Sequence, residues 1–69
     1  MTNTKQINNL ISDSGLKKNF IADRLGISYY ALRQKLDGVT EFKTSEAAEL
    51  CEVLGIDDPK EITAIFFSK

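Results

Sequence analysis

The sequence predicts an all-α protein: a small bundle of five short helices in one domain over residues 1–69. Apolar residues recur at spacings of three and four, as on one face of a helix, and no segment alternates with the period of two that marks a strand. Glycines at positions 15, 26, 38 and 55 each follow a helical segment, where glycine ends a helix readily. A chain of 69 residues that is 42% hydrophobic can bury one modest core.

The first two predicted helices are short and amphipathic. One covers about Thr4 to Ser14, and its apolar stripe is formed by Ile7, Leu10 and Ile11. The next covers about Lys17 to Leu25, with Phe20 beside an inward face of Ile21, Ala22 and Leu25. The start of this second helix is weak, because lysine cannot cap free N–H groups and its charge opposes the helix dipole. A bound phosphate would relieve this.

The third predicted helix contains two adjacent tyrosines. It starts after Ser28, a favourable N-cap, and ends near Asp37, with Leu32 and Leu36 as its core pair. Neighbouring side chains on a helix point about 100° apart, so both tyrosines cannot be buried. At least one of them must face something other than the core.

A helical wheel divides the two tyrosines. Tyr30 points away from the core together with Gln34, and Arg33 lies beside them. Tyr29 falls at the edge of the apolar stripe, where we expect it to be half-buried and to anchor the helix to its neighbours. Lys35 is expected to lay its stem along the core edge and its ammonium group in solvent.

The last two predicted helices complete the core. One runs from Thr44 or Ser45 to Leu54, and its stripe consists of Ala47, Leu50, Cys51 and Leu54. We expect Cys51 to be a buried apolar side chain, and Glu46, Glu49 and Glu52 to form the solvated face. The final helix begins near Pro59, which suits a first turn, with Ile62, Ile65 and Phe66 on one face and Phe67 off it.

The spacing between residues 18 and 38 predicts a helix-turn-helix. Ala22 is small, as is needed where a second helix crosses closely, and Gly26 lets the chain turn sharply four residues later. Ile27, Leu32 and Leu36 then hold the second helix against the first. Such a pair can place its second helix in the major groove of DNA.

In these features the chain resembles the Cro/repressor-type, lambda-repressor-like helix-turn-helix regulators of temperate phages. The resemblance rests on FIADRLGISYYALRQKLDG, EFKTSEAAELCEVLGI and KEITAIFF, and it spans nearly the whole chain. The segment LRQKLDGVTEFKTSEAAELCEVLGI looks especially like short regulators from phages of Gram-positive bacteria. The resemblance implies operator DNA binding in a lytic/lysogenic genetic switch, without catalysis or cofactor.

The resemblance also implies which residues bind. The family reads DNA from the first turn and outer face of the second motif helix, and it contacts phosphate with the start of the preceding helix and the following loop. Carried over by position, the DNA- or partner-binding residues are Lys18, Asn19, Ser28, Tyr29, Tyr30, Arg33, Gln34, Gly38, Thr40 and Lys43. An arginine can bind a guanine edge with two hydrogen bonds, and a glutamine can do the same at adenine.

The charge is distributed unevenly along the chain. The net charge is −1, but residues 17–38 hold five basic and two acidic side chains, whereas residues 39–69 hold seven acidic and three basic ones. Such a monomer should bind DNA weakly, because nonspecific affinity comes mainly from phosphate neutralisation. A homodimer would double the contacts. Ile65, Phe66 and Phe67 are its candidate interface, with Phe67 as a last piece of core being the equal alternative.

Other partners and chemistries are disfavoured. The chain has no histidine, and one cysteine can form neither a zinc site nor an internal disulfide, so we expect no enzyme, metal or cofactor. No apolar run approaches the roughly 20 residues that cross a bilayer, and the first ten residues lack the pattern of a signal peptide. We therefore expect no membrane partner and a location in the cytoplasm of a bacterial host.

An alternative function is modulation of repression. Some small phage proteins of similar make-up act as antirepressors that bind the phage repressor protein. Tyr30 and Arg33 would then be interface anchors, because aromatic residues and arginine dominate such contacts. The sequence pI of about 5.2 favours this alternative over DNA.

Overall fold

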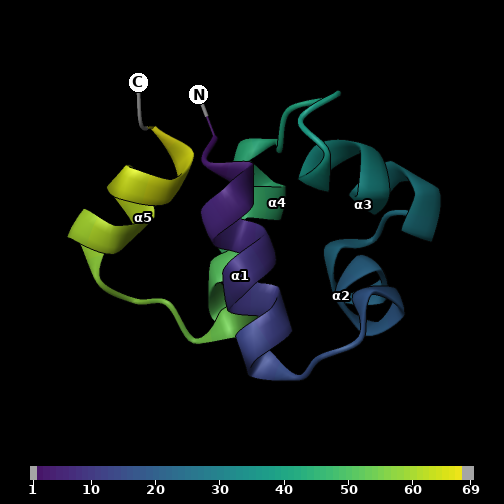
Figure 1. Ribbon diagram of the computed structural model, residues 1–69, viewed down its shortest axis with the longest axis horizontal. Coiled ribbons are helices and arrows are strands. Elements are labelled where there is room, and N and C mark those ends of the chain that lie inside the picture. Colours follow the sequence, from purple (N-terminus) through teal and green to yellow (C-terminus); the bar gives the residue numbers. More distant parts are fainter. Residues whose placement is uncertain (1, 68–69) are drawn as a thin grey trace.

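The structure, a computed structural model, describes residues 2–67, and all regular structure in this range is helical (Figure 1). The helices are α1 (Thr4–Ser14), α2 (Lys18–Leu25), α3 (Tyr29–Leu36), α4 (Thr44–Leu54) and α5 (Pro59–Phe66). The predicted all-α bundle of five helices is confirmed. The five helix starts and the ends of the first four helices agree with the prediction to within one residue.

Helix α1 is the centre of the bundle. It packs against α3, α4 and α5, while α2 packs against α3 and α4. Figure 1 shows α5 on one side of α1 and the α2–α3 pair on the other. The Asn3 backbone N–H donates a hydrogen bond to the Ile65 carbonyl, so the segment before α1 also holds α5.

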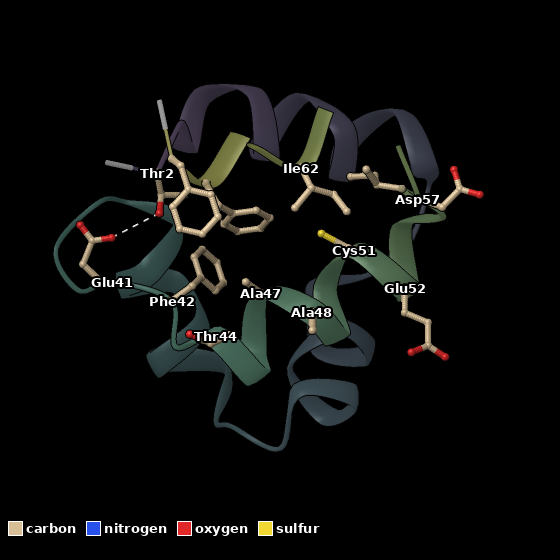
Figure 2. A pocket seen from close by; sticks show the side chains of 13 residues that line it. Thr2, Glu41, Phe42, Thr44, Ala47, Ala48, Cys51, Glu52, Asp57 and Ile62 are labelled. Atoms are coloured by element: carbon tan, nitrogen blue, oxygen red, sulfur yellow. Dashed lines mark hydrogen bonds between the residues drawn. The ribbon is translucent and has the colours of Figure 1, made fainter. Parts of the chain in front are cut away.

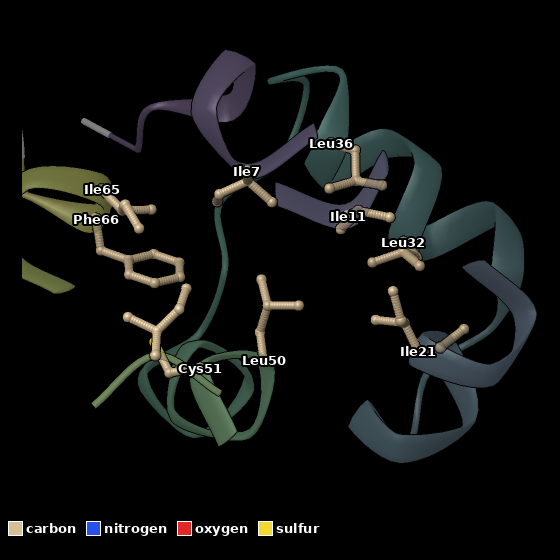
Figure 3. Packing of buried hydrophobic residues seen from close by; sticks show 11 residues of the cluster. Ile7, Ile11, Ile21, Leu32, Leu36, Leu50, Cys51, Ile65 and Phe66 are labelled. Atoms are coloured by element: carbon tan, nitrogen blue, oxygen red, sulfur yellow. The ribbon is translucent and has the colours of Figure 1, made fainter. Parts of the chain in front are cut away.

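The core draws on every helix (Figure 3). Its fully buried large side chains are Ile7, Ile21, Leu32, Leu50 and Ile65. Burying an aliphatic side chain of this size stabilises the fold by roughly 1.5–3 kcal/mol. The predicted core pair of α3 and the buried state of Cys51 are confirmed.

Phe20 was expected beside the inward face of α2. It is 46% exposed and therefore only partly buried. That face is set by Ile21 and Ala22, which are both buried. Phe20 lies about 100° around the helix from Ile21, on the side away from Ala22, at the edge of this face.

A three-residue turn joins α2 to α3. Gly26 has a φ of +73°, and the N–H groups at the end of α2 return to the carbonyls of Ala22 and Asp23. A side chain at this left-handed position would be strained, so glycine favours the turn. The Ser28 hydroxyl then accepts a hydrogen bond of 3.0 Å from the Ala31 N–H and caps α3. Lys17, at the start of α2, provides no side-chain cap, as predicted.

A buried ion pair joins α3 to α4, and it overturns two predictions. The Lys35 Nζ lies 3.0 Å from the Glu46 Oε1, and the two side chains are only 10% and 9% exposed. Lys35 also donates to the Glu41 carbonyl at 3.0 Å and lies 6.0 Å from the centre of the Phe42 ring. The ammonium group of Lys35 is therefore not in solvent, and Glu46 is not part of a solvated face.

The buried Glu46 side chain also stabilises the start of α4. Its carboxylate accepts a hydrogen bond of 2.8 Å from the Lys43 backbone N–H, an otherwise unpaired donor before the first turn of α4. Burial alone would raise the pKa of the Glu46 carboxyl. The hydrogen bonds from Lys43 and Lys35 and the charges of both lysines outweigh burial, so this pKa lies below its ordinary value of 4.5.

We expect Glu46→Gln to lower the free energy of unfolding by about 3 kcal/mol near neutral pH, because the Lys35 ammonium stays buried without its counter-charge. Glutamine keeps the shape of the side chain and can still accept from Lys43. Urea unfolding followed by far-ultraviolet circular dichroism measures the difference.

The same difference should depend on pH. A carboxyl whose pKa is lowered by folding contributes its full stability above its unfolded pKa and loses it as the pH falls through the folded pKa. The free energies of unfolding of wild type and Glu46→Gln should therefore become more similar as the pH falls from about 7 to about 3. An equal difference at both ends of this range would contradict the assignment.

Candidate nucleic-acid interface

The outer face of α3 consists of Tyr29, Tyr30, Arg33 and Gln34. Leu32 and Leu36 are buried on the opposite side, so packing fixes which side of α3 faces outward. Tyr30 is 70% exposed and Tyr29 is 44% exposed. The predicted orientation of Tyr30 and Arg33 away from the core is confirmed, and Gln34 is partly exposed beside them.

Two hydrogen bonds order this face. The Gln34 amide nitrogen donates to the Tyr30 hydroxyl at 2.6 Å, and the Arg33 Nη1 donates to the Tyr29 hydroxyl at 3.4 Å. Each pair is separated by four residues, so the partners lie one above the other on the helix. The Tyr29 hydroxyl thus supports Arg33 on the same helix, and Tyr29 is about half-buried, as predicted.

The Arg33 guanidinium remains available as a donor group. Its Nη2 lies 4.0 Å from the Asp37 carboxylate, at the limit of an ion pair, and both side chains are about half exposed. The hydrogen bond to Tyr29, the charge interaction with Tyr29 and the Asp37 carboxylate together raise the pKa of Arg33. Its positive charge is therefore held at one end of the outer face.

The other predicted site residues lie on segments before and after α3. Lys18 and Asn19 form the uncapped start of α2, and Thr40 and Lys43 are exposed on the segment that leads to α4. The Val39 N–H donates to the Gln34 carbonyl at 2.9 Å, which closes the end of α3. Among the predicted site residues within 2–67, side-chain hydrogen bonds join Arg33 to Tyr29 and Gln34 to Tyr30, and the Thr40 N–H donates to the Gln34 carbonyl at 3.4 Å.

Acidic side chains of α4 neutralise part of the basic segment. Glu49 forms an ion pair of 2.8 Å with Arg24 of α2, and Glu46 is paired with Lys35. Acids of α4 therefore already pair with two of the five basic side chains in residues 17–38, and Asp37 lies 4.0 Å from a third, Arg33. Sequence reasoning missed both pairs, because their partners are far apart along the chain. The available clue was that Glu46 and Glu49 are three residues apart and therefore share one face of α4.

The predicted dimer surface is wrong for two of its three residues. Ile65 and Phe66 are buried in the core of their own chain, because α5 lays its apolar face on α1. Phe67 is 70% exposed, so it is not a last piece of core either. Of the three residues, Phe67 is the one that is exposed.

Two further features of the part of the chain that the structure describes bear on ligands. No group of three or more His, Cys, Asp or Glu side chains among residues 2–67 is arranged to hold a metal ion. In the same range, no helix combines the length and apolar character needed to cross a bilayer.

Comparisons with protein-family models, with curated proteins and with solved structures find no match for this chain. The likeness to phage regulators therefore depends on the residues themselves and stays a prediction. What the fold adds is an exposed, internally hydrogen-bonded face on a short helix that follows a three-residue turn.

We expect Tyr30→Ala and Gln34→Ala each to change the free energy of unfolding by less than about 0.5 kcal/mol, because both side chains lie outside the core. Leu32→Ala, on the inner side of the same helix, is the control and should cost about 3 kcal/mol. Urea unfolding measures all three. A large loss in Tyr30→Ala would mean that this tyrosine maintains the fold instead of serving a ligand.

Proposed function

We propose that this protein is a phage-type transcriptional regulator that binds operator DNA through the outer face of α3 and occludes promoters, without catalysis or cofactor. The observation that supports this best is the pair of hydrogen bonds that hold Arg33 and Gln34 in place on an exposed helix surface. Side chains ordered before binding lose less freedom on contact with a base edge.

The chemistry of the face fits a major groove. Arg33 offers paired donors to guanine, and Gln34 offers a donor and an acceptor to adenine. The exposed ring of Tyr30 can pack on a thymine methyl group, or its hydroxyl can bond phosphate. The eight residues of α3 extend about 12 Å, a length that a major groove accommodates.

The start of α2 supplies the phosphate contacts in this proposal. Lys17 gives no side-chain cap, so the first N–H groups of α2 lack a side-chain acceptor from that position. A phosphate there would accept from these N–H groups and meet the positive end of the helix dipole. Lys18 and Asn19 lie in the same first turn.

We expect Arg33→Ala to weaken binding to duplexes selected from a random DNA library by about tenfold, because one bidentate base contact is worth roughly 1–3 kcal/mol. Lys60→Ala is the matched control, since it removes one exposed positive charge from α5. Fluorescence anisotropy with the selected duplex and with an unrelated duplex measures both variants.

Lys18→Ala separates phosphate contacts from base contacts. It should weaken both duplexes alike and reduce the slope of log affinity against log salt by about 0.9. If no duplex can be selected, or if Arg33→Ala and Lys60→Ala behave alike, operator binding by this face is excluded.

A protein partner is the second candidate function, and one observation favours it. Ion pairs with Glu49 and Glu46 engage Arg24 and Lys35, which leaves few cations to neutralise phosphate. In this alternative, Tyr30 and Arg33 would bind the phage repressor protein and modulate repression. Co-expression with the repressor discriminates the two. A stable complex that Arg33→Ala disrupts, together with no retention on DNA, would replace the first proposal.

A further inference from the structure

A groove is lined by residues of α4 and α5 and of the segments next to them. Helices α4 and α5 both pack against α1, but they make little contact with each other. The groove between them has a volume of about 630 Å³ (Figure 2). None of the residues that line it belongs to the outer face of α3.

The floor of the groove is apolar. Figure 2 shows Ile62 of α5 and Cys51 of α4 facing each other across it. At one end the rings of Phe42 and Phe66 meet edge to face, with their centres 6.0 Å apart. Phe67 also lines the groove, although 70% of its surface is exposed. A concave apolar surface of this kind on a small domain marks a binding site for another molecule.

Among residues 2–67, the charged side chains that line the groove are all acidic. They are Glu41, Glu52 and Asp57, and no lysine or arginine of this range lines the groove. The pKa of the Cys51 thiol is raised by burial first and by the negative charge of Glu61 second, so the thiol stays neutral. The groove therefore combines an uncharged floor with a negatively charged rim.

We propose that this groove binds a short, basic, amphipathic helix of a partner protein. Apolar side chains spaced by three and four residues would fill the space between α4 and α5, and lysine or arginine side chains would lie against Glu41, Glu52 and Asp57. Helix α4 has 11 residues and extends about 16 Å, which matches about three turns of a bound helix.

A second copy of this chain is a poorer occupant. In a symmetric dimer the same patch meets itself, so the three rim acids of one copy would face those of the other. Charge complementarity selects a cationic partner instead. Because the groove shares no residue with the outer face of α3, a partner helix and a ligand of α3 can be bound at the same time.

The test is a titration of the nitrogen-15 labelled protein, followed by the chemical shifts of its backbone amides. The probe is a helical peptide of about 15 residues with leucine at positions i, i+3, i+4 and i+7 and lysine or arginine elsewhere. One control peptide carries glutamate in place of the basic residues, and another has the same composition in scrambled order. We expect the basic amphipathic peptide alone to shift amides of α4 and α5.

Two charge reversals locate the binding surface. Glu52→Lys should lower the affinity for the basic peptide by about threefold to tenfold, the range expected when one exposed charge pair is lost and the charge is reversed. Asp13→Lys is the matched control, since Asp13 is also an exposed acid near the end of a helix but does not line the groove, and it should leave the affinity unchanged.

Several outcomes would overturn the proposal. They are equal shifts with the acidic or scrambled peptide, shifts confined to α3, equal effects of the two reversals, or no binding of the basic peptide at about millimolar concentration. Self-association that maps to α4 and α5 without any peptide would assign the groove to a second copy. None of these results depends on whether α3 binds DNA, so the two proposals fail separately.

Discussion

The buried ion pair between Lys35 and Glu46 joins the two helices that carry the candidate interface and line the groove. Lys35 belongs to the helix that carries the candidate nucleic-acid interface, and Glu46 belongs to the helix that lines the groove. The pair also satisfies the Glu41 carbonyl and the Lys43 N–H, so it organises the whole connection between α3 and α4. Removing one partner leaves a buried charge and an unpaired backbone group. The ion pairs of Arg24 with Glu49 and of Arg33 with Asp37 are more exposed and therefore weaker.

Most of the helices and the core could be predicted from the sequence, because both depend on local rules. The spacing of Ile7, Leu32 and Leu50 within their segments identifies the inward faces, and Gly26 and Ser28 locate one turn. Periodicity does not reveal what covers the other faces. Glu46 lies off the apolar stripe of α4, so the sequence suggests a solvated residue, but the Lys35 side chain of α3 reaches it and the pair is buried.

The candidate site could be predicted in its orientation but not in its electrostatics. The two tyrosines and their partners four residues later share one face by helix geometry alone. The neutralisation of Arg24 by Glu49 depends on contacts between α2 and α4 that no local pattern contains. The groove was not predicted. It forms because α5 packs against α1 and makes little contact with α4, and this arrangement is not visible in the sequence.

Helix α4 contacts both α2 and α3 and also lines the groove. Its side chains Glu46 and Glu49 hold α3 and α2, while Ala47, Ala48, Cys51 and Glu52 line the groove. A molecule bound in the groove would alter the Glu46–Lys35 and Glu49–Arg24 ion pairs if it displaced α4 even slightly. Thermodynamic linkage then requires reciprocity. If binding in the groove changes the affinity of α3 for its ligand, binding at α3 changes the affinity of the groove by the same factor.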